Sequence, residues 1–168
     1  MKMKFFKSIL LFGVVSFVVA SVIYFVISLV FKAPLGALYR MFLYHHAHPY
    51  QYIAIVAVVY SVIAAIWAYY FHDTKKWKRY LGIGIVLLLT MVISNIACGV
   101  LWKIHDMQAG WFTHGRRFYS DLIWGAGKGL YLGWLIVALS IPYNIIMLVV
   151  GVIITDRGAK FIFKGNED

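Results

Sequence analysis

Residues 8–31 read SILLFGVVSFVVASVIYFVISLVF, and this stretch decides the fold because it contains no charged side chain. As an α-helix it would be about 36 Å long, enough to cross a hydrocarbon core of about 30 Å. The Val-Val-Ala sequence ending at Ala20 resembles a signal-peptide cleavage site, but the apolar run continues to Phe31, further than a cleavable segment usually does. We therefore interpret residues 8–31 as an uncleaved membrane helix.

Three more apolar runs follow this one along the chain, at residues 52–71, 80–102 and 130–155. The chain is 63% hydrophobic and only 13% charged, whereas soluble domains are about half apolar and a quarter charged. The sequence thus predicts an all-α integral membrane protein, a bundle of four transmembrane helices in a single domain over residues 1–168. The two short outer loops, around residues 32–51 and 103–129, are expected to form a small cap, and the first of them contains a short surface helix.

The basic residues predict the orientation of the four helices. One side of the membrane receives ten of them, namely Lys2, Lys4, Lys7, Lys75, Lys76, Lys78, Arg79, Arg157, Lys160 and Lys164. The other side receives six, namely Lys32, Arg40, Lys103, Arg116, Arg117 and Lys128. Ten against six predicts that both termini are cytoplasmic, in a multi-pass protein of the cell membrane. The net charge of +10 then reflects contact with anionic headgroups rather than nucleic acid.

Histidines are concentrated on the predicted outer side, which holds five of the six in the chain. They are His45, His46, His48, His105 and His114. Imidazole titrates near neutral pH, but acid/base catalysis also needs a carboxylate that orients it. Asp121 suits this role better than Asp106, because Asp106 directly follows His105 and adjacent side chains rarely point at each other. The candidate catalytic residues are therefore His114, His45, His48 and Asp121.

An enzyme built on these histidines would act on a lipid-linked or lipidated substrate at the outer leaflet. Arg116 and Arg117, together with Arg40, are the candidate substrate-binding residues, because guanidinium groups bind phosphate through paired hydrogen bonds. The alternative interpretation of both groups is ordinary contact with water, lipid phosphate or backbone. The histidine spacing matches no zinc motif, and the sequence predicts no metal site and no cofactor.

Small residues recur at every fourth position in two of the runs, a spacing that allows close helix contact in lipid. One stripe consists of Ala57, Ser61 and Ala65, and the other of Gly125, Gly129 and Gly133. The glycine stripe is predicted to pack on the alanine stripe, on another membrane protein or on a second copy of this chain.

Two asparagines lie inside the predicted spans. Asn95 is expected about 10 Å deep and Asn144 about 21 Å deep, too far apart to bond each other easily. Pro142 is predicted to kink the fourth helix, with Asn144 or Ser140 stabilising the kink. The alternative interpretation is that these groups line a passage for a small solute. Cys98, the only cysteine, excludes an intrachain disulfide and is interpreted as a packing residue.

In span number and loop character the chain resembles several groups of small four-helix bacterial membrane proteins. Among them are immunity proteins against pore-forming toxins and outer-face acyl-transfer enzymes with paired histidines. No shared motif accompanies this resemblance, so it assigns no residue a role. The first functional hypothesis is a non-enzymatic interaction partner, such as an accessory, regulatory or immunity-type subunit. The alternatives are a membrane enzyme of the acyl-transfer type and a transporter subunit.

Overall fold

The computed structural model describes residues 2–30, 48–110, 118–139 and 141–163, and every regular element in them is a helix. The helices are α1 (Lys2–Val30), α3 (Pro49–Phe71), α4 (Lys76–Gln108), α5 (Phe118–Leu139) and α6 (Ile141–Phe163). By length and composition, α1, α3 and α4 can each cross a membrane, and α5 with α6 adds a fourth crossing if the bent pair counts as one span. The fold is thus all-helical, with three to four candidate membrane spans.

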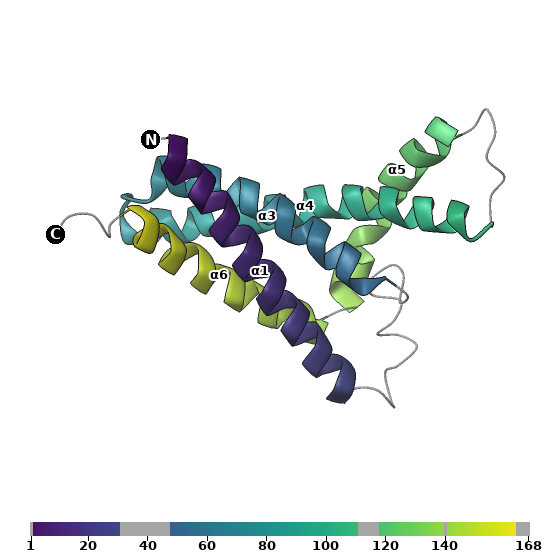
Figure 1. The fold of residues 1–168 in the computed structure, drawn as a ribbon, viewed down its shortest axis with the longest axis horizontal. Helices are drawn as coiled ribbons and strands as arrows, with labels where there is room; N and C mark the ends of the chain where they lie inside the picture. Colours follow the sequence, from purple (N-terminus) through teal and green to yellow (C-terminus); the bar gives the residue numbers. More distant parts are fainter. Residues whose placement is uncertain (1, 31–47, 111–117, 140, 164–168) are drawn as a thin grey trace.

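Helices α1, α3, α4 and α6 lie alongside one another, and α5 crosses α4 at an angle (Figure 1). The start of α1 and the end of α6 meet at one end of the molecule, which we call the proximal end. At the opposite, distal end, α4 extends past the start of α3. The helices are closest together at the proximal end and diverge towards the distal end.

The small residues of α3 form a buried helix-packing surface, as the sequence predicts. Ala57, Ser61 and Ala65 are all buried. A Cβ atom placed on Gly13 of α1 would lie 3.4 Å from the Ser61 Cβ, so the two helices pack closely there. Small side chains let helix backbones approach in lipid, where packing rather than the hydrophobic effect holds helices together.

Ionic and aromatic contacts hold the proximal end together. Arg79 at the start of α4 binds Asp156 of α6, with its Nε 2.8 Å from the Asp156 Oδ1. Lys160 binds the other carboxylate oxygen at 2.6 Å. The ring of His72, after α3, stacks on Phe163 of α6 with ring centres 4.7 Å apart. These contacts fix the end of α6 against the α3–α4 turn.

Glycines bring α4 and α5 into backbone contact. A Cβ atom on Gly129 would lie 2.9 Å from the Gly99 Cα, and one on Gly125 would lie 2.8 Å from the Gly99 carbonyl oxygen. A Cβ atom on Gly133 would overlap the side chain of Asn95. The stripe Gly125, Gly129 and Gly133 thus packs on α4, and not on the alanine stripe of α3 as proposed from the sequence. Self-association through these glycines would require α5 to leave α4.

The apolar run expected as one kinked span, residues 130–155, is divided between α5 and α6, which are bent by 97° relative to each other. Pro142 is the second residue of α6. Proline has no N–H to continue a preceding helix, but is tolerated in a first helical turn, so the chain starts a new helix here. Asn144 Nδ2 donates a 2.6 Å hydrogen bond to the Val137 carbonyl, one of the carbonyls that a helix end leaves unpaired. The expected stabilising role of Asn144 is confirmed, at a break rather than a kink.

Candidate functional site

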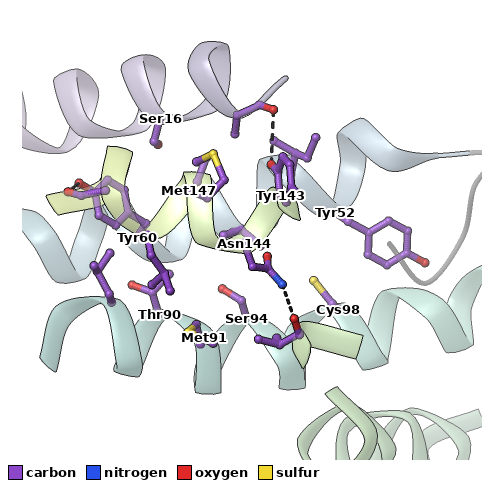
Figure 2. A pocket seen from close by; sticks show the side chains of 18 of the residues that line it. Ser16, Tyr52, Tyr60, Thr90, Met91, Ser94, Cys98, Tyr143, Asn144 and Met147 are labelled. Carbon is purple, nitrogen blue, oxygen red and sulfur yellow. Dashed lines mark hydrogen bonds between the residues drawn. The ribbon is translucent and has the colours of Figure 1, made fainter. Parts of the chain in front are cut away.

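A cavity of about 180 Å³ lies between the helices. Helix α4 contributes one wall and α6 the facing wall, and residues of α1, α3 and α5 line the rest (Figure 2). The lining includes Leu87, Met91, Met147 and Leu148, and contains no Asp, Glu, Lys, Arg or His among the described residues. The cavity is therefore an apolar and uncharged space.

Most hydroxyl groups of the lining are already hydrogen-bonded. Tyr60 bonds Thr155 Oγ1 at 2.7 Å, and Thr90 donates to the Val86 carbonyl at 2.8 Å. The Tyr143 hydroxyl donates to the Ala20 carbonyl at 3.4 Å, across from α6 to α1 (Figure 2). These groups satisfy each other or the backbone, so they hold helices in place and offer little to a ligand.

Two neighbouring residues of α4 carry polar groups that lack such partners in the described part of the chain. The Ser94 hydroxyl and the Asn95 Nδ2 are buried atoms without a hydrogen-bond partner among the described residues. Ser94 is 3% exposed and Asn95 is 6% exposed, and both line the cavity. Figure 2 shows the Ser94 hydroxyl pointing from α4 into the space below Asn144. Buried polar groups are nearly always paired, so unpaired ones require an explanation.

A histidine cluster lies at the distal end of the same chamber. Tyr52 lines the cavity, but its hydroxyl points away from it towards the distal end (Figure 2). This hydroxyl lies 3.1 Å from Nδ1 of His105. The other imidazole nitrogen, Nε2, lies 2.8 Å from Oε1 of Gln51. The Gln51 oxygen only accepts, so Nε2 donates to it. In the neutral imidazole, Nδ1 then accepts from the Tyr52 hydroxyl.

His48 completes this cluster at the start of α3. Its ring centre lies 4.7 Å from that of His105, with the ring planes inclined by 43°. His105 is buried, and both of its ring nitrogens are engaged. The cluster therefore joins the end of α4 to the start of α3 through side chains.

The candidate catalytic residues of the sequence are only partly described. His48 lies in the cluster above, and Asp121 lies in the first turn of α5. Within the described residues no hydrogen bond or ion pair joins these two side chains. The other predicted site residues lie outside the described residues, namely His45, His114, Arg40, Arg116 and Arg117. The surface helix expected in the first loop lies outside them as well.

Sequence reasoning missed the position of His105 because it ended the third span at Trp102. Helix α4 in fact continues to Gln108. Ser94, Cys98 and His105 are all buried, and their separations of four and seven residues place them on one helix face. Extending that periodicity beyond Trp102 would have predicted a buried His105.

A second unexpected contact occurs where α4 meets α5. The Nζ of Lys103 lies 4.9 Å from the centre of the Trp124 ring, and the Nζ of Lys128 lies 5.2 Å from it. Trp102 packs beside the same ring, at 6.2 Å between ring centres. Lys103 is buried, and the indole π-system attracts its charge. This explains how a helix that contains a buried lysine continues past the apolar run.

In the part of the chain that the structure describes, no three His, Cys, Asp or Glu side chains are grouped so that they could hold a metal ion. Comparison with known proteins adds no assignment: no family model, curated protein or solved structure matches this chain.

Proposed function

We propose that this is a small multi-pass protein of the cytoplasmic membrane that acts by binding another membrane protein, as an accessory, regulatory or immunity-type subunit. The feature that supports this most is the set of exposed aromatic side chains on α5. Its exposed rings are those of Phe118, Tyr119, Trp124, Tyr131 and Trp134. Tyrosine and tryptophan are the residues that most often dominate binding between proteins.

The outer face of α1 provides a contrast within the same molecule. Its exposed side chains are mostly aliphatic, among them Leu10, Val14, Val18 and Val22, as is usual for a surface that meets lipid tails. Helix α5 is also held rigidly, because its glycines contact the α4 backbone directly. A rigid aromatic surface loses little conformational freedom on binding, which favours affinity.

The proposed topology has four crossings, with α5 and α6 together forming the fourth, and both termini in the cytoplasm. The contacts of α6 with the α3–α4 turn support a return of the chain to the side from which α1 starts. The excess of basic residues at the proximal end supports its assignment to the cytoplasm.

Photo-crosslinking in native membranes tests the partner proposal. A photoreactive residue is placed at Tyr119 or Tyr131, which are 77% and 80% exposed, and the matched control carries it at Val14 of α1. We expect one discrete protein adduct from the α5 positions and only lipid adducts from Val14. Lipid adducts alone from both helices would contradict the proposal. The variant His48→Ala is expected to retain the α5 adduct.

Two observations favour the alternative functions. The close approach of His48 and His105 favours a membrane enzyme that acts on a lipid-linked substrate. Loss of function in a folded His48→Ala protein that still forms the α5 adduct would select this alternative. The cavity favours a transporter subunit, for which solute flux in reconstituted vesicles is the direct test.

A further inference from the structure

The cavity, which all five helices line, carries an inference that is independent of the proposed partner. Its volume is about 180 Å³. An engineered protein cavity of about 150 Å³ with apolar walls stays dry and binds benzene. The space therefore suits one ring-sized apolar group.

The unpaired donor groups of α4 indicate that a ligand of the cavity should also carry a polar group. The Ser94 hydroxyl and the Asn95 Nδ2 are both donors without partners among the described residues. An acyl chain or a bare hydrocarbon in the cavity would leave both donors unpaired in an apolar environment, which is unfavourable. A ligand with a hydrogen-bond acceptor, such as a carbonyl oxygen, would satisfy at least one of them.

The absence of charged side chains from the described lining limits the charge that a ligand can carry. Within the described residues no ionisable Asp, Glu, Lys, Arg or His side chain lines the space, so nothing there would compensate the burial of a charged ligand. We propose that the cavity binds an uncharged, membrane-soluble molecule with a ring-sized apolar body and a carbonyl acceptor, the acceptor facing the Ser94 hydroxyl.

Two methionines of the lining make the proposal measurable. Met91 of α4 and Met147 of α6 both border the cavity (Figure 2), while Met3 is exposed near the start of α1. The full chain, labelled at its methionine methyl groups and held in lipid nanodiscs, is titrated with acetophenone and with ethylbenzene. These probes have nearly the same shape, but only acetophenone carries a carbonyl. Empty nanodiscs correct for partition into lipid.

We expect saturable shifts of the Met91 and Met147 signals with acetophenone, an unchanged Met3 signal, and weaker binding of ethylbenzene. Ser94→Ala should weaken acetophenone binding about threefold to tenfold, the range for one hydrogen bond, and leave ethylbenzene binding unchanged. Thr90→Val is the matched control and should change neither, because the Thr90 hydroxyl already donates to Val86.

Three results would overturn the proposal. Shifts that do not saturate, or that include Met3, would mean partition into lipid only. Equal affinities of the unsubstituted protein for both probes would mean that the cavity recognises apolar shape alone, or that water already satisfies the donors. An equal loss of both probes in Ser94→Ala would mean a structural effect. The comparison of the two probes on the unsubstituted protein does not depend on the variants folding.

Discussion

Gly129 shows how much of this fold depends on single missing side chains. Its Cα lies against the α4 backbone, where a Cβ atom would collide with the Asn95 carbonyl and approach the Gly99 Cα to 2.9 Å. Gly127, two residues earlier on the same helix, has no heavy atom within 4 Å of the corresponding position. The two residues are thus of the same type, but only Gly129 is packed against the backbone of another helix.

We predict that Gly129→Ala lowers the free energy of unfolding by about 1–3 kcal/mol, because backbone atoms cannot move aside as side chains do. Gly127→Ala should be neutral or slightly stabilising, since alanine favours helix. Unfolding in mixed detergent micelles, followed by circular dichroism, measures both. Equal effects of the two substitutions would show that α5 does not pack on α4 as described.

Tyr52 allows a second residue-scale prediction. Tyr52→Phe leaves the buried His105 Nδ1 without its donor, which should cost about 1–3 kcal/mol of stability. Tyr50→Phe is the control, because Tyr50 is exposed and makes a ring contact with Tyr24 that does not need the hydroxyl. In ¹⁵N NMR spectra we expect His105 protonated at Nε2 only. A proton on Nδ1 would contradict the hydrogen-bond assignment.

At the scale of helices, the sequence predicted correctly which segments are helical, because local composition determines this. Three charge-free runs match helices α1, α3 and α4 closely, namely 8–31, 52–71 and 80–102. The reason is that a long apolar run in lipid must satisfy its backbone hydrogen bonds internally, as a helix does. Helix α4 continues to Gln108, beyond the predicted span 80–102 and the buried Lys103. Its contact with Trp124 comes from another helix, so no reading of the α4 sequence alone could reveal it.

Local composition did not predict the break between α5 and α6 or the cavity. Pro142 signalled a disturbance, but its position in the sequence does not give the size of the bend, which is 97°. Asn95 and Asn144 were assigned different depths by counting along straight helices, whereas the bend places both at one cavity. The sequence identified both asparagines as unusual, but not the space that they share. The predicted outer histidine site stays a prediction, apart from the position of His48.

The contact between α4 and α6 supports a prediction at the same scale. Asp156→Asn removes the charge that pairs with Arg79, whose side chain is only 14% exposed. We expect a loss of about 1–3 kcal/mol of stability, because the largely buried Arg79 charge is left without its counter-charge. Lys160→Ala, which removes the more exposed partner of Asp156, should cost less than about 0.5 kcal/mol. Thermal unfolding of both variants tests this ranking, and the reverse order would contradict it.

For the whole molecule, the meeting of the α1 start and the α6 end at the proximal end leads to a prediction about topology. Epitope tags at the two termini should be protected from protease in intact spheroplasts and become accessible together after lysis. The prediction follows because an even number of crossings returns the chain to its starting side. Accessibility of only one tag before lysis would indicate an odd number of crossings and contradict the four-crossing proposal.

The divergence of the helices towards the distal end also affects the surrounding lipid. Helix α4 has 33 residues and α3 has 23, which makes them about 50 Å and about 35 Å long. They are joined at the proximal end, and α4 extends past the start of α3 at the distal end, where α5 adds further width (Figure 1). A wedge of this shape occupies more area in one leaflet than in the other. In the proposed membrane topology we therefore expect the protein to favour curved membrane, with the more crowded leaflet on the convex side.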